Sequence, residues 1–391
     1  MNNLLIIDEI IEGGAIKLYS QLLVKGIKKN LNSKNLNFLN DTLNDDIKPQ
    51  NFNFFKKLIF KNKLIYNLLK RKYLNFKIER YTNKILNLDD STILIIPYII
   101  QDSNIKLDKL YEAISKKKVI LVIHDLHIYH FPEQWDKTIR ESVYYRYNLL
   151  VNQSKGIIVH NNFTKDDVCK KFEIKSNLVD VIKLPPFFDP ATSTINRDEL
   201  NSIFDLENIE YGIWASSSTA SHKNHERLIM AWKILVDKGY NIKLICTGHT
   251  SPRWEVISKL IDDLNLKDYI LFTGVVTNAE ASSLITNAKF SICPTLFAGG
   301  GPVPAAESII MGIPLLISNI QECRELLDEK LENAYFFNPL DEIDIANSII
   351  NLLSDYNYAM KKAKIAQETY LKSRNWEKSS LDYINVVKKI L

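Results

Sequence analysis

The chain has 391 residues, of which 46% are apolar and 25% charged, a balance that excludes wholesale disorder and allows two or three packed domains. Its four cysteines lie far apart without a Cys-x-x-Cys pair, which indicates reduced thiols in a cytoplasmic protein. Asp8 and Glu9 cut short the first apolar run, and no later run approaches the length of a membrane span. We therefore expect no signal peptide and a cytoplasmic protein, either soluble or attached peripherally to the inner face of the cytoplasmic membrane.

The net charge of +4 is unevenly distributed along the chain. The stretch from Lys56 to Lys84 holds ten basic residues and a single acid, Glu79, so it carries +9 and the remainder sums to −5. Its apolar positions 64, 65, 68 and 69 share one helical face with flanking cations. This pattern predicts a helix that docks on an anionic membrane surface. The alternative is a helix whose apolar face packs on the core while its lysines are solvated.

Short apolar runs alternate with helical patterns, which predicts α/β folding around parallel sheets. In the first half we expect strands at 4–7, 92–97, 119–123 and 156–159, and a further segment at 178–184. We expect helices at 16–29 and 164–172, the second of which is capped by Thr164. Polar, turn-rich residues 189–205 are the best candidate linker. The pattern then restarts, with strands expected at 212–215, 243–247, 269–273, 290–294 and 314–318. Helices are expected at 225–238, 254–264, 279–287, 305–311 and 341–353, followed by one long helical tail at 356–391.

The most informative segment follows the strand that ends at Pro294. Gly299, Gly300 and Gly301 allow strained backbone and close approach of a ligand, and they lead into a helix with Glu307 in its first turns. Amides at a helix N-terminus favour the negative charge of a phosphate, whereas a carboxylate beside them suits hydroxyls. The segment predicts a ligand with a phosphate end and a sugar end. The alternative is a tight turn with a solvated acid.

A second loop, Ser216 to His225, delivers hydroxyl side chains and then Lys223 to the start of a helix. A lysine at a helix N-terminus opposes the helix dipole, and a bound phosphate would explain it. A solvated loop lysine is the equally open alternative.

The seven histidines fall at strand ends or in the loops just after them, where open α/β sheets bind ligands. The spacing of His124, His127 and His130 could suggest a metal. We expect none, because Pro132 disfavours a helix there and no carboxylate set is spaced with them.

The order and spacing of these motifs resemble the GT-B glycosyltransferases, specifically the retaining, nucleotide-sugar-dependent family 4 enzymes of bacterial surface-polysaccharide synthesis, such as lipopolysaccharide or O-antigen. The resemblance covers essentially the whole length. It is carried by Gly13-Gly14, VIHDLHIYHFPEQW (122–135), GIIVHNNFTKDDV (156–168), SHKNHERLIMAW (221–232), LFTGVV (271–276), the segment 290–327, FFNPLD (336–341) and Trp376-Glu377.

The resemblance implies a GT-B fold in the α/β class: two Rossmann-like domains facing a central cleft, with a C-terminal helix that returns to the N-terminal domain. Residues 1–190 would form the acceptor-binding domain, 191–370 the nucleotide-sugar-binding domain and 371–391 the returning helix.

The resemblance also implies roles for individual residues. Lys223 would hold the diphosphate, Glu307 the ribose hydroxyls, and Val275 and Val276 the nucleobase. His124 would lie beside the transferring sugar, and all three of His124, Lys223 and Glu307 would be catalytic. The remaining donor contacts would come from Gly13 and Gly14, a loop closing over the phosphates, and from Ser216, Ser218, Gly299, Gly300 and Gly301.

Two positions depart from the family pattern. The first acid of Glu-x7-Glu falls at Gly299, and the arginine that usually precedes the lysine falls at Ser218. Hydroxyls of Ser216, Ser217 and Ser218 and the glycine-loop amides could replace those contacts.

The function implied is transfer of a hexose, such as mannose, from a nucleotide-diphosphate sugar to a glycan or lipid-linked glycan with retention of configuration. No metal, other cofactor or nucleic-acid partner is expected. The alternatives are a nucleotide-sugar 2-epimerase and a catalytically inert GT-B scaffold subunit.

Overall fold

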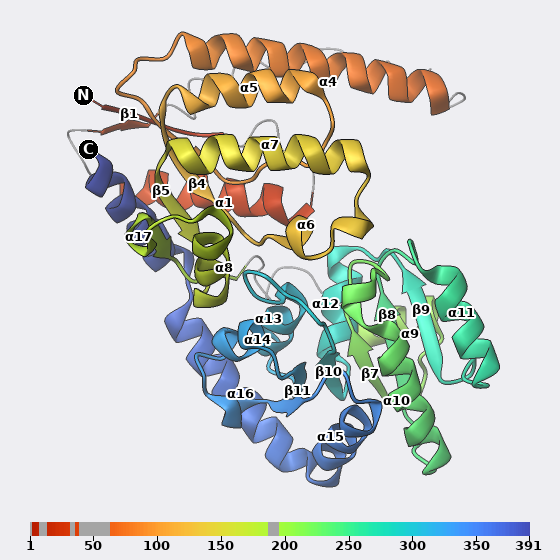
Figure 1. Cartoon of the computed structure of the whole chain (residues 1–391). Helices are drawn as coiled ribbons and strands as arrows, with labels where there is room; N and C mark the ends of the chain where they lie inside the picture. The colour runs from red at the N-terminus through yellow and green to blue at the C-terminus, as the bar shows by residue number, and fades with distance from the viewer. Residues whose placement is uncertain (1, 8–13, 32–35, 39–62, 187–194) are drawn as a thin grey trace. The chain divides into compact units, whose positions relative to one another are not determined.

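The computed structural model describes residues 2–7, 14–31, 36–38, 63–186 and 195–391 (Figure 1). The chain divides into two compact units, each described by itself below: unit 1 comprises 1–183 and 376–391, and unit 2 comprises 184–375. Among the described residues, no helix is both long and apolar enough to cross a lipid bilayer.

Unit 1 is built on a parallel six-stranded sheet in the order β2-β1-β3-β4-β5-β6. Strands such as β3 are buried along their whole length, as expected where both faces of a parallel sheet are covered. The strands are β1 (Asn2–Ile6), β2 (Leu36–Phe38), β3 (Ile93–Ile96), β4 (Lys118–Val122), β5 (Ser154–Val159) and β6 (Val179–Val181).

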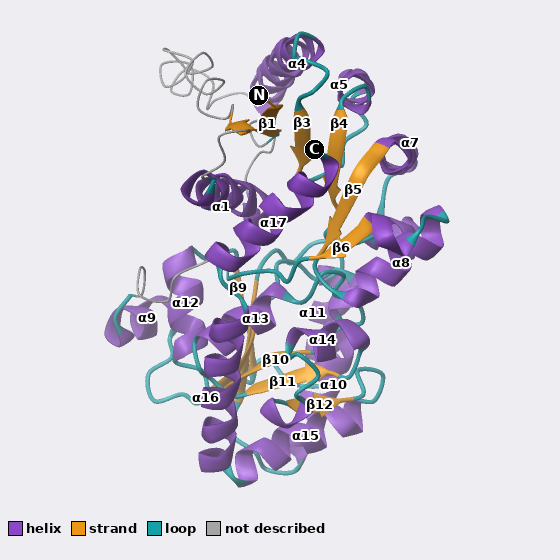
Figure 2. Ribbon diagram, turned by 90° about the vertical axis from the view of Figure 1, so that its left-hand side faces the viewer, coloured by secondary structure: helices purple, strands orange, loops and turns teal. Residues whose placement is uncertain are grey.

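Helices cover both faces of this sheet. Helices α4, α5 and α7 lie side by side over one face, and their apolar residues join the sheet in one core (Figure 1). On the other face, α1 lies against α17, the last helix of the chain (Figure 2). The helices are α1 (Gly14–Asn30), α4 (Lys63–Leu86), α5 (Ile105–Ser115), α6 (His127–His130), α7 (Lys137–Gln153), α8 (Asn162–Phe172) and α17 (Trp376–Ile390).

The contact between α1 and α17 is close at Gly26. A Cβ on Gly26 would lie 3.0 Å from Cβ of Ser380. Nearby, the buried hydroxyls of Tyr19 and Tyr383 are hydrogen-bonded to each other. The expected return of the C-terminal helix to the N-terminal domain is therefore confirmed.

Unit 2 is built on a second parallel sheet, in the order β12-β11-β10-β7-β8-β9. Its first and fourth strands, β7 and β10, are neighbours, so the chain reverses its direction of winding between them. Gly212 in β7 faces the ring of Phe290 in β10, which would lie 2.4 Å from a Cβ at that position. The strands are β7 (Tyr211–Trp214), β8 (Lys243–Thr247), β9 (Ile270–Gly274), β10 (Phe290–Cys293), β11 (Leu315–Ser318) and β12 (Tyr335–Phe337).

The helices of unit 2 bury two apolar clusters against this sheet. One cluster includes Trp232 of α10 and Ile257 of α11, and the other includes Leu200 of α9 and Leu284 of α12. The helices are α9 (Arg197–Phe204), α10 (His225–Asp237), α11 (Trp254–Asp263), α12 (Asn278–Thr286), α13 (Val303–Ile310), α14 (Gln321–Leu326), α15 (Glu342–Ser354) and α16 (Tyr356–Ser373).

Three local predictions are corrected by the structure. Part of the expected linker 189–205 is helix α9, which Asn196 caps by accepting from the Glu199 amide; residues 187–194 lie outside the described residues. Helix α8 is capped not by Thr164 but by Asn161, whose side chain accepts from the Thr164 amide.

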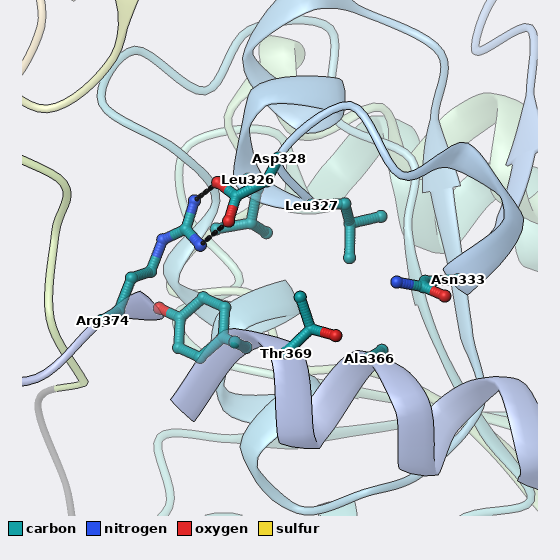
Figure 3. A pocket seen from close by; sticks show the side chains of 8 residues that line it. Leu326, Leu327, Asp328, Asn333, Ala366, Thr369 and Arg374 are labelled. Carbon is teal, nitrogen blue, oxygen red and sulfur yellow. Dashed lines mark hydrogen bonds and ion pairs between the residues drawn. The ribbon is translucent and has the colours of Figure 1, made fainter. Parts of the chain in front are cut away.

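The expected single tail helix is in fact two helices, α16 and α17, separated at residues 374–375. Arg374 turns away from the helix axis and forms a two-pronged ion pair with Asp328, at 2.8 and 3.2 Å (Figure 3). A small pocket beside this pair is lined by apolar side chains such as Leu326 and Leu327 and by polar ones such as Asn333 and Thr369. The ion pair joins the end of α16 to the segment after α14 within unit 2.

Candidate functional site

Two loops of unit 2 begin side by side where the winding of the sheet reverses. One follows β7 and contains Ser216 to Lys223, and the other follows β10 and contains the three glycines. Ligands of open α/β sheets bind at this reversal, outside the carboxyl ends of the strands. The topology therefore brings together the two segments that the sequence singled out separately.

The loop after β7 is hydrogen-bonded to the loop after β8. Ser217 accepts from the His249 amide at 3.0 Å, and Thr219 donates its hydroxyl to the Thr250 carbonyl. Gly248 makes this approach possible, because its φ is +97° and a Cβ there would lie 2.2 Å from the Ser216 carbonyl oxygen. The Ser216 hydroxyl donates to the Ser218 carbonyl at 2.7 Å, so its proton is engaged within the loop itself.

Lys223 lies just before α10, and its charge affects the pKa values of two neighbouring residues. Burial, together with the nearby Lys223 charge, lowers the pKa of His225 to about 3. Burial raises the pKa of Cys293, the last residue of β10, to about 12, and Lys223 opposes that rise. The Lys223 charge therefore acts at the start of α10 and at the end of β10.

Asn224 fixes the start of α10 in this position. It has left-handed backbone angles, and its buried side-chain amide donates to the carbonyls of Pro294 (2.9 Å) and Pro339 (2.7 Å). Thr295 adds a third tie, because its hydroxyl lies 3.1 Å from the His222 carbonyl. Together these bonds join the Lys223 loop to the glycine loop. Nothing in the sequence pattern marks Asn224 as a contact residue, although asparagine tolerates left-handed angles better than most residues.

The glycine loop runs directly into α13. Gly299 and Gly301 have positive φ values of 44° and 114°, as the run of glycines predicted. The buried carboxylate of Glu322, in α14, accepts from the Ala298 amide at 3.3 Å. An acid thus supports the loop in which the expected first acid of Glu-x7-Glu is replaced by Gly299. Glu322 was missed because nothing local links it to a loop 24 residues earlier.

Glu307 is on α13 and is partly buried. Burial raises its pKa from 4.5 to about 7. Within the described part of the chain, no hydrogen-bond donor or cation pairs with its carboxylate. A half-buried acid without a partner costs free energy that a ligand's hydroxyl groups can recover.

Val275 and Val276 follow β9 at the same end of the sheet. The Val275 side chain is 64% exposed, whereas Val276 packs against the cluster that contains Leu284. An exposed apolar residue of this kind is available to a flat ligand, but an isolated one is also common on protein surfaces.

In unit 1, His124 follows β4 and is held by two contacts. Its Nε2 lies 2.9 Å from the Pro97 carbonyl oxygen, and its Nδ1 lies 2.9 Å from Nε2 of His160. Both ring nitrogens are therefore engaged inside unit 1. Of the expected glycine loop, Gly13 lies outside the described residues, and Gly14 begins α1.

The other two histidines of the 124–130 spacing have separate partners. The Trp135 indole donates to Nδ1 of His127 at 3.3 Å, and Nε2 of His130 lies 2.7 Å from an Asp167 carboxylate oxygen.

A scan against protein families matches residues 206–369 to the model described as glycosyl transferases group 1. Among curated proteins, the O-antigen chain mannosyltransferase RfbU of Salmonella typhimurium is 24% identical over 234 residues. That alignment spans 59% of this chain and 60% of RfbU.

Solved structures with the same fold cover more of the chain at lower identity. HepE from Anabaena, in complex with UDP and glucose, matches with a TM-score of 0.67 and 14% identity, over 100% of both chains. Sucrose-phosphate synthase from Thermosynechococcus elongatus matches with a TM-score of 0.66 and 14% identity, over 100% of this chain and 98% of that one. TarM from S. aureus matches with a TM-score of 0.61 and 18% identity, over 79% of this chain and 58% of TarM. These likenesses establish the fold as GT-B.

Proposed function

We propose that this chain, a GT-B protein whose second unit carries a glycosyl transferases group 1 domain, transfers a hexose from a nucleotide-diphosphate sugar to a glycan or lipid-linked glycan with retention of configuration. The observation that carries the proposal is the unpartnered, half-buried Glu307 carboxylate on the same sheet end as Lys223. An acid for hydroxyls and a cation for phosphates are the two charges that a nucleotide diphosphate requires.

The proposed catalysis is mainly electrostatic. Lys223 and the amides of the glycine loop stabilise the negative charge that develops on the departing diphosphate. The bond from the anomeric carbon to the phosphate oxygen breaks, and the acceptor oxygen bonds to that carbon on the same face. The acceptor's proton passes to the departing phosphate oxygen. Unit 1 receives the acceptor. Similarity to the O-antigen mannosyltransferase RfbU supports mannose as the hexose and a surface polysaccharide as the product.

A screen of UDP-, GDP- and TDP-sugars by thermal shift and saturation-transfer NMR tests the donor assignment. At least one nucleotide diphosphate should stabilise the protein, and its sugar should be consumed only when acceptor is present. Consumption without acceptor, with return of an epimer, would instead identify a 2-epimerase. Binding of the acceptor alone, with no nucleotide bound, would identify the inert scaffold that the replacement of the acid at 299 and the arginine at 218 favours.

Glu307→Gln distinguishes the stability that the buried, ionised carboxylate costs from the contribution of that carboxylate to nucleotide binding. The folded protein raises the pKa of Glu307 above its ordinary value, so stability is lost as pH rises from about 4.5 through about 7. Glutamine avoids that loss. The midpoint of thermal unfolding should therefore rise relative to wild type at pH 8 and change little at pH 5.

The same substitution should weaken nucleotide binding about ten- to a hundredfold at pH 8, since hydrogen bonds to a charged group contribute roughly 1.5–3 kcal/mol. The matched control is Glu255→Gln, at an exposed position on α11, which should change neither quantity. Unchanged nucleotide affinity in Glu307→Gln would remove Glu307 from the donor site.

A second proposal concerns docking of α4 on an anionic membrane. The structure confirms a helix within the basic stretch, but Ile78, Tyr81 and Ile85 pack into the core, so only part of its surface is available. The available part includes exposed Lys72 and, one turn later, Phe76, which is 62% exposed. Lys56, Lys57 and Lys61 lie outside the described residues.

Arg71→Glu with Lys72→Glu should reduce co-sedimentation with vesicles that contain anionic lipid by at least tenfold. Each basic residue near such a surface contributes about 1 kcal/mol, and each reversal removes that attraction and adds repulsion. Lys361→Glu with Lys364→Glu, on exposed positions of α16, makes the same change in net charge and is the control. Equal loss in both double variants, or binding that ignores lipid charge, would contradict docking through α4.

A further inference from the structure

The imidazole ring of His249 is exposed at the carboxyl end of β8, and the proposed function gives it no role. Its position after a strand places it where open α/β sheets bind ligands. None of the residues that the structure describes forms a hydrogen bond, an ion pair or a ring contact with this side chain. A flat, polar aromatic ring is therefore available to a ligand at this edge of unit 2.

Backbone hydrogen bonds extend the sheet beyond β8 and hold His249 between two neighbouring loops. On one side, the His249 amide donates to the Ser217 carbonyl at 3.0 Å, and His249 pairs with Ser218 in a parallel bridge. On the other side, the Gly248 amide donates to the carbonyl of Gly274, the last residue of β9, at 2.8 Å. His249 thus lies between the loop after β7 and the loop after β9.

The order of the strands indicates which part of a nucleotide would lie over His249. The strands follow one another as β10-β7-β8-β9, about 4.8 Å apart. The groups proposed to hold the diphosphate, Lys223 and the glycine loop, follow β7 and β10, and the Lys223 charge acts at the end of β10. The exposed Val275 follows β9, on the opposite side of β8. A ligand that extends from Lys223 to Val275 therefore crosses His249 with the half that is remote from the diphosphate.

We propose that His249 is a nucleobase-contacting residue of the donor site, and that its imidazole ring stacks on the base beside Val275. The ligand class is the flat aromatic base of a nucleoside diphosphate. Every base presents a π-face, so this contact favours nucleotides over simple diphosphates without choosing among the bases. The inference rests on the proposed function, because it takes a nucleotide-diphosphate sugar to be the ligand.

Isothermal titration calorimetry of the full-length protein with UDP, GDP, TDP and inorganic pyrophosphate tests this contact. His249→Ala should weaken binding of the nucleotides that wild type binds about five- to a hundredfold, the usual contribution of one base–aromatic stack. Its affinity for pyrophosphate should stay unchanged. His249→Phe keeps a flat ring and should bind nucleotides nearly as well as wild type.

The matched control is Asn241→Ala, an exposed position before the opposite end of β8, which should change neither affinity. Only the backbone of His249 is bonded to its neighbours, so all these variants should unfold at the wild-type temperature without ligand.

Unchanged nucleotide affinity in His249→Ala would overturn the inference. A loss of pyrophosphate affinity as large as the loss of nucleotide affinity would also overturn it, because the ring would then contact the diphosphate. Equal losses in His249→Phe and His249→Ala would exclude stacking. The proposed donor site fails separately: wild type would then bind none of the three nucleotides, whereas failure of this contact alone leaves a nucleotide affinity that Glu307→Gln still lowers.

Discussion

Replacing Lys223 with alanine is expected to reduce sugar transfer about a hundred- to a thousandfold, the usual loss when one preorganised group that stabilises a developing negative charge is removed. The physical reason is the place of the ammonium group, which is close enough to affect both His225 at the start of α10 and Cys293 at the end of β10. No second cation of the expected pattern shares the work, because Ser218 stands where the arginine would be.

Steady-state kinetics with the donor identified by the nucleotide screen measures this loss as a ratio of kcat/KM values. Lys233→Ala, on α10 ten residues later, removes the same charge from the surface and is the matched control. Lys223→Arg should recover part of the activity, since it keeps the charge but not the shape of the ammonium. Transfer by Lys223→Ala at the rate of Lys233→Ala would show that the lysine is a solvated loop residue.

Gly248→Ala is expected to destabilise unit 2 by about 2–5 kcal/mol. A non-glycine residue with left-handed backbone angles costs about 1–2 kcal/mol, and overpacking against neighbouring atoms adds typically 1–3 kcal/mol. Both apply at Gly248, where φ is +97° and the added methyl would overlap the backbone of Ser216 and Ser217.

Gly239→Ala measures the cost of left-handed backbone angles without the cost of overpacking. Gly239 also has a positive φ, of +83°, but a methyl there would meet nothing within 4 Å. It should therefore cost only about 1–2 kcal/mol. Urea unfolding of the two variants gives the difference between them. Equal destabilisation would mean that the Ser216 loop can move away from Gly248 at no cost, and the loop would then not be a rigid part of the donor site.

The elements best predicted from the sequence are those whose signal is local. Strands such as β8 and helices such as α10 were expected within one or two residues of where they lie, because apolar runs and periodic faces are set by neighbouring residues. Glycine conformations at 299 and 301 were also predictable, since few other residues adopt positive φ without strain.

The errors arose where distant residues decide the structure. Arg374, at the break between α16 and α17, pairs with Asp328, 46 residues earlier, and the helical pattern gives no sign of this partner. Helix α9 is short and buries one residue, Leu200, which a polar stretch conceals. For α4, the helix was predictable, but how its apolar side chains divide between core and surface was not.

In the candidate site, too, residues with a local signal could be predicted and residues with distant partners could not. Lys223 and Glu307 could be nominated, and stay predictions, because a charge next to a turn suited to phosphate is a local signal. Glu322, Asn224 and His160 were missed because their roles depend on partners 24, 70 and 36 residues away. The sequence can thus nominate the groups that would touch a ligand more readily than those that hold them in place.

The location of α17 has a consequence for how the protein is made. The first part of unit 1 is translated before unit 2, but unit 1 is closed by Trp376–Ile390, which is translated after unit 2. Unit 2 is one uninterrupted stretch and can fold while synthesis continues, whereas α1 must wait with Tyr19 uncovered until α17 emerges. A nascent chain that stalls before Trp376 therefore displays an apolar surface to chaperones and proteases, so truncated copies are marked for removal by their own incomplete sheet domain.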